Sequence, residues 1–203
     1  MPAETATAFR RALLYVLQRG GGEVPMTRLH KLLYLADLQY YHEHGRTITG
    51  APWVRHNFGP MTKAMLPSLA AMSGHEVVEE KKATKKGFEL HLIRRGPDPR
   101  FEADLAPGEA DAIDSILRLT KKLTDDEVIA LSYATTPMRY LVEQELVAGK
   151  KLIDLPIDFR SMTDPAGLQG IAATPDLEAR AKAQQEDLEL MAPYLERALS
   201  GGG

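Results

Sequence analysis

The amino-acid sequence predicts a mainly α-helical domain with one small β-hairpin. Apolar residues recur at helical spacing in several segments, and glycine and proline separate these segments. Between His75 and Arg94 the pattern instead alternates apolar with polar residues, which is typical of a two-stranded hairpin. The chain has 203 residues, 44% of them hydrophobic and 26% charged, so it has the composition and length of a globular domain with a real core.

Two helices are expected in the first 45 residues. The first, from about Thr7 to Arg19, carries a repeating apolar face and ends at a run of three glycines. The second follows Pro25, with Thr27 as its candidate N-cap, and continues to about Glu43 before Gly45 stops it.

The next segment mixes extended and helical signals. Residues 47–57 favour extended structure, and Gly50 and Pro52 prevent one long strand. A third helix is expected to begin near Pro60. Pro67 lies inside its apolar pattern and predicts a kink or a restart.

Three more helices are expected after the hairpin. One follows Pro107, and the next begins at Thr124, which is a plausible N-cap ahead of an acidic first turn. A further helix begins at Thr136 and Pro137, because proline is favoured in the first turn of a helix.

A change in composition near residue 150 predicts a boundary there. Residues 1–150 form the expected domain, and residues 151–203 form a C-terminal extension with an irregular loop, a helix over 176–199 and a glycine tail. A thin apolar stripe on that helix leaves three alternatives open. In these alternatives the helix docks on its own domain, pairs with a second copy of the chain, or folds on a partner protein.

Composition argues against several classes of protein. The chain has no cysteine, which excludes disulfides, thiolate metal sites and a cysteine nucleophile. Its net charge of −3 argues against an overall electrostatic grip on nucleic acid. No apolar run approaches the roughly 20 residues of a membrane span, and no secretory signal pattern is present. We therefore expect a cytoplasmic protein with no membrane contact.

The predicted second helix carries a polar and aromatic stripe beside its apolar one. His30, Tyr34, Asp37 and Tyr41 share one side of the helix. Rings with polar tips suit either a hydrogen-bonded network that supports the fold or contact with a partner, and both alternatives stay open. A metal site is not expected, because His30 and Asp37 lie two turns apart with no third ligand specified.

The extended segment holds a second group of candidates. Trp53 is the only tryptophan, and Arg55, His56 and Asn57 follow it closely. Tryptophan and arginine are enriched at binding hot spots, but a single tryptophan also serves as a core anchor. Both interpretations remain open here.

Motifs around these two groups resemble one family. The chain reads KLLYLAD from Lys31 to Asp37, then a glycine-bounded piece from Gly45 to Gly50, then NFGP from Asn57 to Pro60. This order resembles the Panacea domain of SocA-like antitoxins, in which a tyrosine more often stands at the position of Phe58. The resemblance is sharpest over residues 10–72 and does not cover the last quarter of the chain.

The resemblance implies an antitoxin that neutralises a cognate protein toxin by direct binding, with delivery of the toxin to a protease as a variant. It also implies a part in phage defence, because such domains are often found near mobile elements. No cofactor or metal is expected, and self-association into a homo-oligomer is left open. The candidate partner-binding residues are His30, Tyr34, Asp37, Tyr41, Trp53, Arg55, His56 and Asn57.

Two other classes of function were compared with this one. A small winged-helix-like DNA-binding regulator would use the basic hairpin tip over Lys81 to Lys86, although Glu79, Glu80 and Glu89 largely cancel its charge, so direct nucleic-acid binding is not expected. An enzyme is not expected either, because the sequence has no nucleophile elbow, phosphate-binding loop or paired-carboxylate motif.

Overall fold

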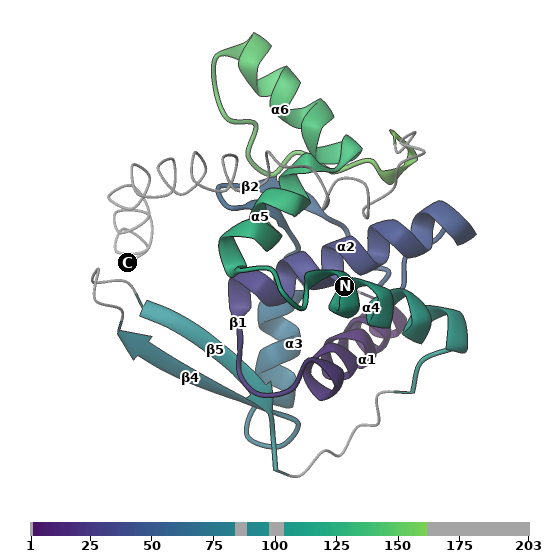
Figure 1. The fold of residues 1–203 in the computed structure, drawn as a ribbon, viewed down its shortest axis with the longest axis vertical. Coiled ribbons are helices and arrows are strands. Elements are labelled where there is room, and N and C mark those ends of the chain that lie inside the picture. Colours follow the sequence, from purple (N-terminus) through teal and green to yellow (C-terminus); the bar gives the residue numbers. More distant parts are fainter. Residues whose placement is uncertain (1, 84–88, 98–103, 162–203) are drawn as a thin grey trace.

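The computed structural model describes residues 2–83, 89–97 and 104–161 (Figure 1). This part contains six α-helices and two small antiparallel sheets, which confirms the predicted class, mainly α with a minor β component. The helices are α1 (Ala3–Gly20), α2 (Met26–His44), α3 (Met65–Met72), α4 (Pro107–Thr120), α5 (Asp125–Ala134) and α6 (Thr136–Ala148). The strands are β1 (Val24–Pro25), β2 (Val54–His56), β3 (Gly59–Met61), β4 (Val77–Ala83) and β5 (Glu89–Arg95), and a 3-10 turn follows at Phe159–Ser161.

Helix α2 lies at the centre of the fold. It packs against α1, α4 and α5, and it also contacts the strands β3 and β5. Every residue from Lys31 to Leu38 is buried, so α2 is enclosed on all sides, as expected for a central helix. The apolar stripe that the sequence shows on one side of α2 therefore describes only part of its buried surface.

The predicted hairpin is confirmed as β4 and β5. Val77 pairs with Arg95 and Ala83 with Glu89, and β1 adds a short third strand beside β5 through Val24 and Ile93. The side chain of Ile93 is fully buried, and β5 contacts both α1 and α2. In Figure 1 this sheet lies at the opposite end of the molecule from α6.

The order α1, β1, α2, α3, β4, β5, with β1 beside β5, is the topology of a winged helix. The hairpin of β2 and β3 is inserted between α2 and α3. A topology alone does not assign a function, so the side chains on these elements have to decide whether nucleic acid is a partner.

The expected helix start at Pro60 is wrong. Gly59 and Pro60 belong to β3, which pairs with β2, and His56 opposite Gly59 leaves a two-residue turn. The helix begins only at Met65. Pro67 is its third residue, where a backbone N–H has no partner within the helix, so the proline begins the helix without a kink.

Other helix ends follow the expected chemistry, with one exception. Thr124 forms a capping box with Glu127, whose backbone N–H donates to the threonine hydroxyl at 3.3 Å. Helix α6 carries Pro137 in its first turn, as predicted. Thr27 is not an N-cap, because α2 already begins at Met26 and its first turn has no side-chain cap.

Residues 151–161, the described start of the expected extension, pack on the domain. The backbone N–H of Arg55 donates to Leu155 at 2.8 Å, and that of Ile157 donates to Trp53 at 2.9 Å. The side chains of Ile157 and Phe159 are buried. The helix expected over 176–199 lies outside the described residues, and the boundary near residue 150 stays a prediction.

Candidate partner-binding site

Three polar side chains of α2 each bind a different segment of the chain. The ammonium of Lys31 donates to the carbonyl of Pro60 in β3 at 2.9 Å. The hydroxyl of Tyr34 lies 2.9 Å from that of Thr135, at the junction of α5 and α6. The carboxylate of Asp37 binds the segment that leads into β2. Three side chains of the KLLYLAD motif thus hold other segments of the chain against the central helix by hydrogen bonds.

Asp37 accepts several hydrogen bonds inside the protein. The indole N–H of Trp53 donates to it at 2.8 Å, the backbone N–H of Thr49 at 2.9 Å, and the Thr49 hydroxyl donates as well. Burial raises the pKa of Asp37 to about 6, although these donors act in the opposite direction. The carboxylate is therefore mostly ionised at neutral pH, and it depends on its donors for solvation.

An aromatic cluster closes over this network. The ring of Tyr34 meets Trp53 edge-on at 5.5 Å and Phe159 at 5.6 Å, and the half-buried Tyr41 meets Phe159 at 5.7 Å. Tyr34, Asp37 and Trp53 are at most 3% exposed. A partner does not reach these three side chains in this conformation, so we assign them to the fold.

Three basic side chains near β3 are shielded from water. Burial, together with the charge of the nearby Arg55, lowers the pKa of Lys31 to about 7. Burial also lowers the pKa of His30 to about 4, so this imidazole is neutral at neutral pH. The pKa of the half-buried His56 is lowered by the same cause. Whether His30, His56 or Tyr41 contacts a partner stays a prediction.

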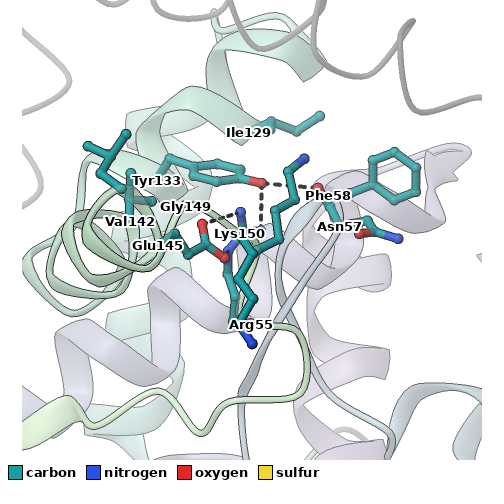
Figure 2. A pocket seen from close by; sticks show the side chains of 11 residues that line it. Arg55, Asn57, Phe58, Ile129, Tyr133, Val142, Glu145, Gly149 and Lys150 are labelled. Atoms are coloured by element: carbon teal, nitrogen blue, oxygen red, sulfur yellow. Dashed lines mark hydrogen bonds and ion pairs between the residues drawn. The ribbon is translucent and has the colours of Figure 1, made fainter.

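A cavity of about 500 Å³ opens beside the turn between β2 and β3 (Figure 2). Two residues of the predicted group, Arg55 and Asn57, line it. The other lining residues come from the same turn, from α5, from α6 and from the loop after α6: Phe58, Ile129, Tyr133, Val142, Glu145, Leu146, Gly149, Lys150 and Lys151.

The floor of the cavity is an ion pair between Arg55 and Glu145. Two parallel hydrogen bonds of 2.9 Å join the guanidinium to the carboxylate, and Arg55 also donates to the Tyr133 hydroxyl at 3.0 Å. Burial opposes the charge of Arg55, but Glu145 outweighs it and the pKa of Arg55 lies above its ordinary value. Figure 2 shows these groups directed at one another, so the charges of Arg55 and Glu145 neutralise each other on this side of the cavity.

Gly59 allows the turn to approach α5. Its φ of +88° favours glycine, and a Cβ at this position would lie 2.7 Å from Cε2 of Tyr133. The Gly-Pro step of the motif is therefore a place of close backbone contact beneath the Tyr133 ring.

Sequence reasoning missed Glu145 and Tyr133. Both lie far along the chain from Arg55, so no local spacing connects them to it. One signal was present for the acid. Pro137, Met138, Leu141 and Glu145 recur at helical spacing on the buried side of α6, and a carboxylate on a buried stripe requires a cationic partner.

Several exposed apolar side chains lie on α6 and in the loop after it, and one of them, Leu146, lines the cavity. Six large hydrophobic residues are exposed in the described part of the chain. Four of them lie between residues 140 and 153, namely Tyr140, Leu146, Val147 and Ile153. Leu146 is 77% exposed and Val147 is 92% exposed. Neighbouring exposed hydrophobic residues of this kind are a common mark of an interaction surface.

Two lysines of the hairpin are paired with acidic side chains. Lys81 forms an ion pair with Glu89 at 2.9 Å, and Lys82 pairs with Glu23 at 2.9 Å. Helix α3 precedes the hairpin, where a winged helix carries its recognition helix. Its sequence is MLPSLAAM, which has no lysine or arginine. Helix α3 therefore lacks the positive charge that binding to phosphate requires, whereas the hairpin also carries the exposed Arg94 and Arg95.

Over residues 2–83, 89–97 and 104–161, no group of three or more histidine, aspartate or glutamate side chains is placed to hold a metal ion. Within the same ranges, no helix combines the length and the apolar character needed to cross a membrane.

Fold and site together define a mainly helical domain whose polar motif residues serve its own structure and whose open cavity lies against α6. A model of the family described as "Antitoxin SocA-like, Panacea domain" matches residues 29–137, more than half of the chain. The protein therefore belongs to the SocA-like antitoxin family with the Panacea domain. Comparisons with curated proteins and with solved structures gave no match.

Proposed function

We propose that this protein neutralises a cognate protein toxin by binding it directly. Its family is one of antitoxins, which supports a toxin as the partner. The observation that carries the proposal is the cavity together with the exposed apolar side chain of Leu146, which lines it. A tight complex would bury roughly 1,600 Å² in total, and this cavity with its surroundings is the natural centre of such an interface.

Occlusion of the toxin requires no chemistry from the antitoxin. The charged groups on the cavity floor, Arg55 and Glu145, bind each other, and Glu145 also accepts from the backbone N–H of Leu152 at 2.8 Å. Such a floor supports a binding role, since its ionisable groups are engaged in holding β2 to α6.

Co-expression with the adjacent gene tests the proposal. We expect the product of that gene to stop growth when it is induced alone, and growth to return when this protein is produced with it. A neighbour that is harmless alone, or that stays lethal in the presence of this protein, would contradict the proposal.

Toxin levels separate occlusion from delivery to a protease. Under occlusion, the rescued cells keep the toxin at its normal level, and a stable complex can be purified. Under delivery, the toxin disappears during rescue, and it returns when the cellular protease is removed. The proposed function, occlusion, predicts the first outcome.

A further inference from the structure

We propose that the cavity is a docking groove for one segment of the toxin, in which an apolar side chain stands next to a carboxylate. We name it the α6 groove, lined by the turn at Asn57 and Phe58, by Ile129 and Tyr133 of α5, and by residues 142–151. The inference rests on the proposed function. It adds where the toxin is held and by what chemistry.

The lining of the α6 groove calls for an apolar side chain. Phe58, Ile129, Val142 and Leu146 all line it, and the volume of about 500 Å³ falls within the roughly 300–1,000 Å³ of ligand-sized pockets. Leu146 is largely exposed although it lines the groove, so an inserted side chain would remove it from water. The floor attracts polar ligands only weakly, because Arg55 and Glu145 are already bound to each other.

The mouth of the α6 groove calls for a carboxylate. Lys150 and Lys151 are exposed, and neither has an ion pair with another described residue. The one acid that lines the groove, Glu145, is committed to Arg55. Two positive charges at the rim therefore remain available for an acidic partner.

The two walls of the groove differ in their relation to the family. The wall formed by the β2–β3 turn and α5 lies within the matched residues 29–137, whereas Val142, Leu146 and the two lysines lie beyond them. We infer that the α6 wall supplies the contacts that are particular to this antitoxin and its toxin.

A second copy of the chain fits the groove less well. A symmetric dimer places the same patch of each copy in one interface, so the lysine pairs of both copies would add four positive charges to it. Like charges at an interface are unfavourable, and an acidic segment of a different protein avoids this conflict.

Binding measurements with matched variants test the inference. The probe is a non-toxic variant of the adjacent gene's product, titrated by calorimetry against the full-length antitoxin. We expect Leu146→Asp and the double variant Lys150→Glu/Lys151→Glu each to weaken the complex about 30-fold or more, since an interface hot spot removed by truncation or charge commonly costs 2 kcal/mol or more.

The chain offers a matched control for each variant. Leu66→Asp changes another exposed leucine, 65% exposed on α3. Lys121→Glu/Lys122→Glu changes another exposed lysine pair that directly follows a helix, α4, and causes the same change in charge. We expect both controls to bind within about threefold of the unmodified protein. Raising the salt concentration should weaken the unmodified complex more than that of the double variant at Lys150 and Lys151.

Each other outcome has a distinct meaning. If the unmodified antitoxin does not bind the neighbour's product, the proposed function fails, and the inference fails with it. If it binds, but the groove variants bind equally well or the controls lose binding instead, only the inference fails. A change of oligomeric state in Leu146→Asp would assign the groove to self-association and also overturn the proposal.

Discussion

The buried face of α2 and the open face of α6 use similar residue types for opposite purposes. On α2, the polar groups of Lys31, Tyr34 and Asp37 are enclosed, and each holds another segment of the same chain. On α6 and just beyond it, the side chains of Leu146 and Lys150 are exposed, and that of Lys150 forms no ion pair with another described residue. The first face makes the fold, and the second is free to meet another protein.

This difference separates the residues that identify the family from those that we expect to recognise the partner. The motif KLLYLAD begins at Lys31 and lies within the matched residues 29–137, while most of α6 lies beyond them. A motif recurs across a family where a fold requires it. A contact surface follows its partner instead, so it leaves a weaker trace in the family pattern. Four substitutions test the contrast, in order of their expected effect on stability.

Asp37→Ala should have the largest effect. It leaves the indole N–H of Trp53 and two donors of Thr49 buried without an acceptor, so the free energy of unfolding should fall by about 4 kcal/mol. Urea unfolding followed by circular dichroism measures this. The matched variant Asp111→Ala, at an exposed position on α4, should stay within about 0.5 kcal/mol of the unmodified protein. If Asp37→Ala lowers the free energy of unfolding only slightly, Asp37 is not essential to the fold, and the contrast between the two faces fails.

Gly59→Ala should come second, with a loss of about 2–3 kcal/mol. The new Cβ would have both an unfavourable φ and a clash with Tyr133 at 2.7 Å. Gly45→Ala isolates the first cause, because Gly45 has a φ of +68° but no neighbouring atom within 4 Å, and it should lose only about 1 kcal/mol. Thermal melting of the two variants side by side gives the difference. Equal losses would mean that the turn does not depend on close contact with α5.

Local patterns in the sequence were enough to predict much of the fold. The alternation around Leu92 predicted the hairpin, and Thr124 with Glu127 predicted a capped helix start, since both signals involve residues near one another in the chain. Pro60 misled the prediction for a physical reason. A proline after a glycine suits a helix start, but here the glycine's positive φ and its pairing with His56 make a hairpin.

The candidate site was predicted less well, because its contacts join distant segments. Asp37 and Trp53 were selected together, but the sequence did not decide between a network and a binding surface, and burial assigns them to the network. Arg55 and Asn57 do line the cavity. The ion-pair partner of Arg55, Glu145, lies 90 residues away in the chain, and only the folded chain brings the two together.

Lys31→Met should alter how stability depends on pH. The unfolded chain keeps a proton on this lysine up to about its ordinary pKa of 10.5, whereas in the folded protein the pKa is lowered to about 7. Between these values the unfolded state binds more protons, so the free energy of unfolding rises with pH. From pH 7.5 to 9.5 this group should contribute a rise of about 2 kcal/mol, which Lys31→Met should remove.

Urea unfolding at the two pH values measures that rise. Lys121→Met serves as the control, because this lysine is exposed and its removal should leave the pH dependence unchanged. An unmodified protein whose stability is flat between pH 7.5 and 9.5 would show that Lys31 remains charged, and the α2 face would then hold its segments by charge as well as by burial.

Leu146→Asp should have the smallest effect on stability, although it should have a large effect on toxin binding. Leu146 is 77% exposed, so the free energy of unfolding should change by only about 0.5 kcal/mol, part of it from placing an acid in the last turn of α6. Leu141→Asp, at a position 4% exposed on the same helix, should be strongly destabilising by contrast. If both substitutions destabilise the protein equally, another part of the chain covers the outer face of α6. The α6 groove would then belong to the fold, as the α2 face does, and the partner would have to bind elsewhere.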